Sequence, residues 1–219
     1  RLGVLVLFRQ WDEVLAVPEP TQEARLHASN VHFTHGFWHF ARGMAFAGSA
    51  QPQQAEAELA LLHTEAGELP ARYTVPAGQL GLEHTLDDLF RESDIETLGL
   101  AEQVLRARIA EARGQGAAAI GYWRRAVALQ DQAAYSEPPL WYYPVRDSLG
   151  AALLRAGAAS EAVAVFQEDL RRRPNDPRAY FGLAAAYTTL HQRGGAAGAQ
   201  ASFEKAWQLA DRPLTLADL

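Results

Sequence analysis

The sequence predicts an all-α protein, built as an α-solenoid of short helix–turn–helix hairpins. Three observations support this fold class. Apolar residues recur three and four positions apart, as in Val163, Phe166 and Leu170, which is helical spacing. Glycine and proline gather between these segments, and no long alternating strand pattern occurs. The helices come in pairs that recur along the chain, which is typical of hairpins that stack on one another.

Each hairpin is placed by its apolar spacing and its turns. Residues 1–20 predict a partial repeat, with the tail of one helix followed by a second helix from Trp11 to Ala16. Four fuller repeats and one long insertion follow. Their expected bounds are 31–66 for repeat 1, 67–97 for the insertion, 98–130 for repeat 2, 139–174 for repeat 3 and 177–211 for repeat 4. Within the insertion we expect a short helix near 82–92 and otherwise loop.

Glycine marks the expected turns inside the hairpins. Gly114, Gly157 and Gly194 stand where one helix ends in the left-handed conformation and its partner begins. The turn of repeat 4 is expected to be longer than the others, over residues 193–198. Between repeats 3 and 4, Asp176 is the expected N-cap, with Pro177 at the first helical position.

The composition is that of a folded, acidic chain. Apolar residues make up 48% and charged residues 21%, the balance of a globular protein. The net charge of −6 argues against a nucleic-acid partner, because such proteins need a basic face. No apolar run approaches the ~20 residues that cross a bilayer, so we expect no membrane insertion. The absence of cysteine suits reducing and oxidising compartments alike. The localisation therefore stays unknown. The cytoplasm is slightly favoured, and the periplasm is the alternative if the chain is a processed one.

The third repeat carries a recognisable motif. In the order L-G-x2-Y…A-x3-F…P it has Leu149, Gly150, Leu153, Ala162, Phe166 and Pro174. The small residues at the matching place of the four first helices are Gly43, Ala107, Gly150 and Ala184, at spacings of 64, 43 and 34. This pattern resembles the tetratricopeptide repeat (TPR), a helix–turn–helix unit of about 34 residues. The resemblance implies a right-handed solenoid.

The whole chain also resembles the C-terminal half of larger, uncharacterised bacterial TPR proteins. The segments that carry this likeness are Phe8–Glu13, Trp38–Gly43 and Trp141–Arg146. Because the chain begins inside a repeat with apolar residues, we expect it to pack on N-terminal repeats that precede it. A structural half of a larger TPR solenoid is therefore one of the alternative functions.

In TPR proteins the first helices line a concave surface that binds peptides. The resemblance therefore implies a protein-interaction scaffold, whose partner is a peptide or a protein domain on the concave face. The groove positions hold Phe37, Phe40, Met44, Arg108, Glu111, Asp147, Arg155, Arg178 and Phe181. They run from an aromatic end to a charged end, where arginines can take a carboxylate.

The aromatic run Trp141, Tyr142 and Tyr143 stands directly before Pro144, which is tolerated only near a helix start. These residues form either an aromatic ledge for a peptide or a packing surface for the loop before them.

Histidines form the second candidate site. His32, His35 and His39 stand at i, i+3 and i+7, on one helical stripe, and imidazoles so spaced can share a Zn²⁺, Ni²⁺ or Cu²⁺ ion. The ordinary interpretation is packing with one hydrogen bond, because no acidic residue lies nearby in sequence to orient the rings. A metal- or small-ligand-binding TPR protein is thus another alternative. We assign no metal and no cofactor.

Catalytic motifs are missing from the sequence. It contains no glycine-rich phosphate loop and no Gly-x-Ser-x-Gly, so we predict that the protein is not an enzyme and assign no catalytic residue.

Overall fold

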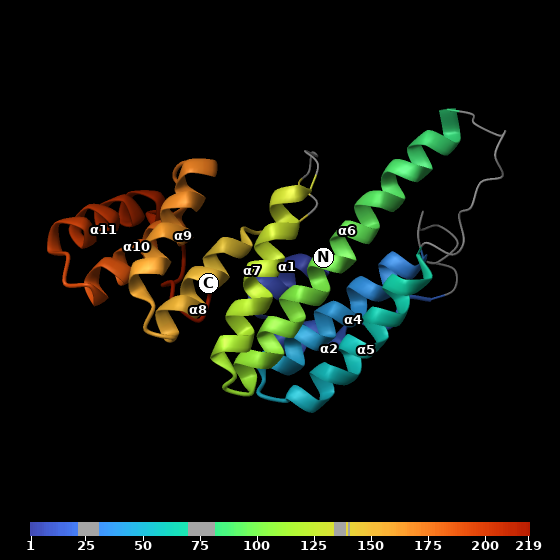
Figure 1. Cartoon of the computed structure of the whole chain (residues 1–219). Helices are drawn as coiled ribbons and strands as arrows, with labels where there is room; N and C mark the ends of the chain where they lie inside the picture. Colours follow the sequence, from blue (N-terminus) through green and yellow to red (C-terminus); the bar gives the residue numbers. More distant parts are fainter. Residues whose placement is uncertain (22–30, 70–81, 134–138, 140) are drawn as a thin grey trace. The chain divides into compact units, whose positions relative to one another are not determined.

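The computed structural model is all-helical in the part of the chain that it describes, which confirms the predicted all-α class. That part comprises residues 1–21, 31–69, 82–133, 139 and 141–219, with backbone alone over 82–92. The helices are α1 (Leu2–Leu7), α2 (Trp11–Ala16), α4 (Val31–Gly48), α5 (Pro52–Glu68), α6 (Leu82–Ala112), α7 (Gly116–Gln132), α8 (Val145–Arg155), α9 (Ala159–Arg172), α10 (Pro177–Thr189) and α11 (Arg193–Trp207) (Figure 1). Residues 70–81 of the predicted insertion lie outside the described residues.

The chain divides into two units. The first comprises Arg1–Gln115 and Ala128–Tyr143, and the second comprises Gly116–Val127 and Pro144–Leu219. No helix of the described part is both long and apolar enough to cross a membrane.

Local signals set the helix ends. Pro177 opens α10, and the side chain of Asp176 accepts hydrogen bonds from the backbone N–H groups of Arg178 and Ala179, at 2.9 and 3.4 Å. The predicted N-cap is therefore confirmed. Pro144 is the N-cap residue of α8, so the aromatic run lies just outside that helix.

Two of the predicted turn glycines adopt the left-handed conformation, with φ +70° at Gly114 and +77° at Gly157. The turn of the last hairpin differs from the prediction, because α11 already begins at Arg193. His191, with φ 56°, takes the left-handed position instead. The prediction of a long turn over residues 193–198 was wrong, because these residues form the first part of α11.

Helix α6 is one continuous helix of 31 residues. The sequence predicted a short helix near 82–92, then loop to residue 97, and a separate first helix of repeat 2 from 98. The structure differs because residues 93–97 contain neither glycine nor proline, so nothing in them stops a helix that has already formed.

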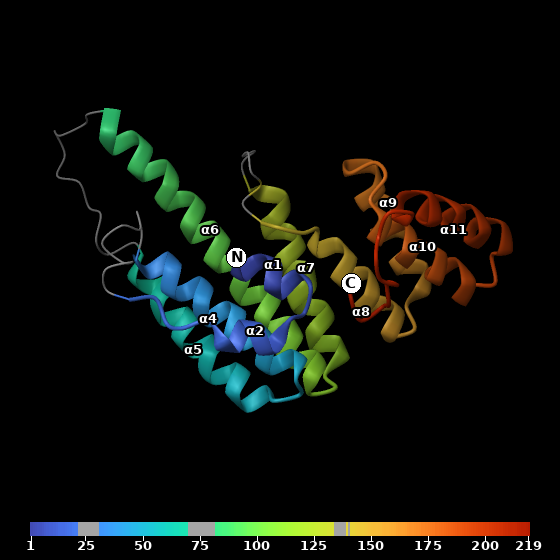
Figure 2. The ribbon, with the colours of Figure 1, turned by 180° about the vertical axis from the view of Figure 1, so that it is seen from behind.

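In the first unit, α4 and α5 pack as a hairpin, and α6 packs on both of them. Helices α1 and α2 lie against α4 (Figure 2). Two glycines allow α4 and α6 to approach. A Cβ atom at Gly36 would lie 2.7 Å from Leu98, and one at Gly43 would lie 2.6 Å from Leu105. Gly36 and Gly43 are seven residues apart on α4, and Leu98 and Leu105 are seven apart on α6. Both contacts therefore lie on one stripe of each helix.

The second unit repeats this arrangement. α8 packs with α9, α9 with α10, and α10 with α11, while the first helices α8 and α10 also contact one another. Phe166 of α9 is fully buried, and its ring lies against Gly150 of α8 and Gly182 of α10. Small residues on the first helices therefore admit the large residue of the second helix.

Candidate functional site

The groove positions of the first unit meet the chain's own aromatic run. The ring of Trp141 lies 5.4 Å from that of Phe40 and 6.5 Å from that of Phe37, between ring centroids. Tyr142 lies 6.4 Å from Phe37. Phe40 is fully buried and Trp141 nearly so. Tyr143 lies beside the other two, its ring centroid 5.1 Å from that of Tyr142. Residues 141–143 thus cover the aromatic end of the predicted groove.

Charged groups border this cluster. Arg108 forms an ion pair with Glu111 at 3.0 Å. Met44, another predicted groove residue, is buried. Burial raises the pKa of Tyr142 well above its ordinary value, and the neighbouring Tyr143 raises it further, against the opposing effect of Arg108. The phenol of Tyr142 therefore stays protonated at neutral pH.

The groove positions of the second unit bind a different segment. Residues 212–219 lie beyond the end of α11, and we refer to them as the 212–219 segment. Arg178 of α10 donates to the backbone carbonyl of Asp218 at 2.6 Å. From α8, Ser148 donates to the carbonyl of Leu219, and Arg155 makes a long contact of 3.5 Å with the carbonyl of Leu216. The red end of the ribbon accordingly lies beside α8 in both views (Figures 1 and 2).

The 212–219 segment has an ordered internal structure. The Asp218 carboxylate accepts hydrogen bonds from the backbone N–H and the hydroxyl of Thr215, at 2.9 and 2.6 Å, and from Arg212 at 3.1 Å. Leu214 and Leu219 are buried, with 7% and 1% of their surface exposed. The segment is therefore a non-helical peptide with a capped turn, anchored by two leucines and by side-chain contacts to its carbonyls.

A buried carboxyl group lies next to this face. Asp147 is fully buried on α8, and its oxygens accept no hydrogen bond from the residues that the structure describes. Burial is the largest effect and raises the pKa of Asp147 well above its usual range. The charges of Asp176 and Asp169 add to it, while Arg178 and Arg173 oppose it.

The ninth groove position, Phe181, packs towards its own hairpin. Its ring centroid lies 5.3 Å from that of Phe203 on α11. The Phe181 ring therefore contributes to packing between α10 and α11.

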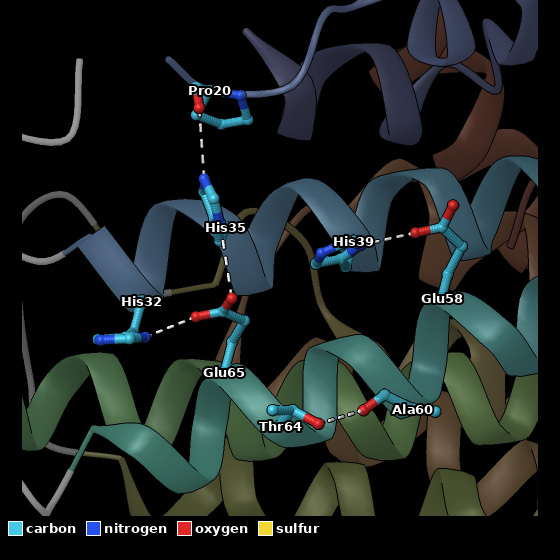
Figure 3. Close-up of polar contacts among 8 residues, drawn as sticks. All are labelled: Pro20, His32, His35, His39, Glu58, Ala60, Thr64 and Glu65. Carbon is cyan, nitrogen blue, oxygen red and sulfur yellow. Dashed lines mark hydrogen bonds and ion pairs between the residues drawn. The ribbon is translucent and has the colours of Figure 1, made fainter. Parts of the chain in front are cut away.

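The histidine stripe is paired with carboxylates of the neighbouring helix (Figure 3). His32 and His35 of α4 both approach Glu65 of α5, with ring Nδ1 to carboxylate distances of 2.6 and 3.5 Å. The Nδ1 atom of His39 lies 2.7 Å from Glu58. The rings are therefore oriented by acidic residues that lie far away in sequence and close in space.

Glu58 is the centre of the tightest of these groups. Its carboxylate also accepts a hydrogen bond from Arg42 at 2.8 Å, and the residue is 7% exposed. Burial by itself would raise the pKa of Glu58, but the hydrogen bonds from His39 and Arg42 outweigh it, and the net pKa is lowered. Glu58 thus ties the two helices of this hairpin together as a charged group.

Within the described residues, no group of three or more histidine and acidic side chains is placed to hold a metal ion. His32 and His35 direct their rings to Glu65, whereas His39 directs its ring to Glu58. In this geometry the ring nitrogens of the stripe face the carboxylates of α5.

The sequence reasoning missed two sets of residues. Glu58 and Glu65 are seven apart, as are His32 and His39, so matched spacing on the two helices of a hairpin was the available signal. The second set is the 212–219 segment, where Leu214, Leu216 and Leu219 follow the last helix.

Comparison with family models, with curated proteins and with solved structures found no match to this chain.

Proposed function

We propose that this chain is a TPR-type helical-repeat protein, a right-handed solenoid that binds an extended peptide segment of a partner protein on its first helices. The proposed function involves no covalent chemistry. One observation carries the proposal: Arg178 and Ser148, from two different first helices, hydrogen-bond to backbone carbonyls of a non-helical segment. Contacts to carbonyls suit peptides in general, since every peptide presents them.

The packing pattern supports the repeat interpretation. In both units a second helix packs against its own first helix and against the next one, while successive first helices also contact each other. This order is what stacked helical hairpins require, because one hairpin cannot bury its apolar face alone. The glycine contacts at Gly43 and Gly150 lie at the small-residue positions that the motif assigns.

Selection from a displayed library of random nonapeptides tests the proposal. Three forms of the full chain are compared: the unsubstituted chain, a groove variant with Arg155→Ala and Arg178→Ala, and a control with Arg171→Ala and Arg193→Ala. We expect peptides to be enriched on the unsubstituted chain and on the control, and to be lost from the groove variant. Equal enrichment on all three would place the binding elsewhere, and no enrichment on any of them would contradict the proposal.

A further inference from the structure

The face formed by α8 and α10 already holds a peptide, which is the 212–219 segment. The side chains of this face contact backbone carbonyls of the segment. Such contacts fix the position of a bound peptide but do not depend on its sequence. Selectivity must then come from the side chains that the segment buries. These are Leu214 and Leu219, while Pro213, Thr215 and Ala217 between them are exposed.

The Asp218 side chain shapes the segment. Its two carboxylate oxygens accept hydrogen bonds from Thr215 and Arg212, which belong to the same segment. The capped turn brings Leu214 and Leu219, five positions apart, into buried positions together. A peptide that holds such a turn before binding loses less conformational entropy when it binds.

We propose that the 212–219 segment is a built-in occupant of the α8–α10 face, and that the partner is a peptide with the same pattern. This inference rests on the proposed function. The pattern is a leucine, a second leucine five positions later, and an aspartate directly before the second leucine. The partner binds by displacing the segment from the face that Ser148, Arg155 and Arg178 form.

The tether makes the segment an effective competitor. The segment is joined to α11 by only residues 208–211, and the indole of Trp207 at the end of that helix donates to the carbonyl of Arg212 at 2.9 Å. A short tether of this kind gives an effective concentration of about a millimolar or more. A free peptide of the same sequence therefore binds weakly until the segment is released.

The test uses a labelled, acetylated and amidated peptide with the sequence of residues 211–219, and measures its binding by fluorescence anisotropy. The release variant is the full chain with Leu214→Asp and Leu219→Asp. The matched control carries Leu61→Asp and Leu209→Asp, which add the same charge at leucines that are 48% and 94% exposed. Amide hydrogen exchange of residues 212–219 is followed in each form.

We expect the segment to exchange faster in the release variant, and this variant to bind the peptide about ten-fold more tightly, or more, than the unsubstituted chain and the control. Adding Arg178→Ala to the release variant should weaken binding about ten-fold, because a charged hydrogen bond to the peptide is lost. A peptide that carries aspartate in place of both leucines should not bind.

The other outcomes separate the two proposals. Equal binding by the unsubstituted chain and the release variant would overturn the built-in occupant but leave the proposed function standing. A released segment without peptide binding would overturn both. Continued protection of residues 212–219 in the release variant would overturn the anchoring by leucines.

A second measurement covers a release variant that does not fold. In the unsubstituted chain, the amides of residues 212–219 should be protected, and Arg178→Ala should speed their exchange without affecting α5. Exchange at the rate of an unprotected peptide in the unsubstituted chain would overturn the built-in occupant.

Discussion

The substitution Gly182→Ala tests whether close approach of the first helices to Phe166 holds the second unit together. A Cβ atom at residue 182 would lie 2.1 Å from the ring of Phe166, about 1.3 Å short of the 3.4 Å where ordinary contact begins. The ring cannot turn aside, because a Cβ atom at Gly150 on α8 would lie 2.3 Å from it. One of the helices must therefore move.

The expected magnitude follows from two opposing effects. Overpacking a core costs about 1–3 kcal/mol, and a rigid ring places this site in the upper part of that range. Alanine gains about 1 kcal/mol over glycine within a helix. The net loss of stability is then about 1–2 kcal/mol, which lowers Tm by roughly 2–8 °C in a chain of this size.

The assay is thermal unfolding followed by circular dichroism, with Gly198→Ala as the control. Gly198 is exposed on α11, and a Cβ atom there would meet nothing within 4 Å, so the control should raise Tm by about 2–4 °C. Phe166→Leu in the Gly182→Ala background should recover part of the loss, with a coupling of about 0.5–3 kcal/mol. A rise in Tm for Gly182→Ala equal to that of Gly198→Ala would refute the reasoning.

Three further substitutions test the charged groups by pH-dependent chemical unfolding. Asp147→Asn should become more stable than the unsubstituted chain as the pH rises above about 3.9: burial raises the pKa of this carboxyl in the folded state, so its ionisation at higher pH destabilises the fold. A pH-independent difference would contradict this. Glu58→Gln should lose about 1.5–3 kcal/mol at pH 7, because His39 loses its charged partner. This loss should shrink below the ordinary glutamate pKa of 4.5, as the lowered pKa of Glu58 is crossed, and a loss that persists at pH 2 would argue for packing alone. Arg124→Ala, which breaks an exposed ion pair with Glu161, should change stability by less than about 0.5 kcal/mol, and a larger loss would show that this pair is not a simple surface contact.

In each unit, part of the predicted groove is covered by another segment of the chain. Residues 141–143 pack over Phe37 and Phe40 in the first unit, and the 212–219 segment contacts Arg155 and Arg178 in the second. The covering segments differ in chemistry, since the first is aromatic and the second binds through carbonyls and leucines. A partner peptide for the second unit must therefore compete with a bound segment rather than enter an open groove.

Much of the helical architecture was readable from the sequence, because the signals are local. Apolar spacing placed the helices, and Asp176 with Pro177 marked a helix start that the structure confirms. Gly43 and Gly150 stand at the matching small-residue positions of the motif, and in the structure a side chain at either position would clash with a neighbouring helix. Each of these inferences depends on a few neighbouring residues and on the geometry of a single helix or turn.

The tertiary structure decided how distant residues pair. His39 and Glu58 are separated by 19 positions, and Ser148 and Leu219 by 71, so no local pattern joins them. The full burial of Asp147 likewise depends on the helices that pack against α8, and not on its neighbours in sequence. Such contacts depend on which helix faces meet after packing. For that reason the sequence alone indicated the helical class and individual helix starts, whereas the tertiary structure determined which surfaces the chain's own segments occupy.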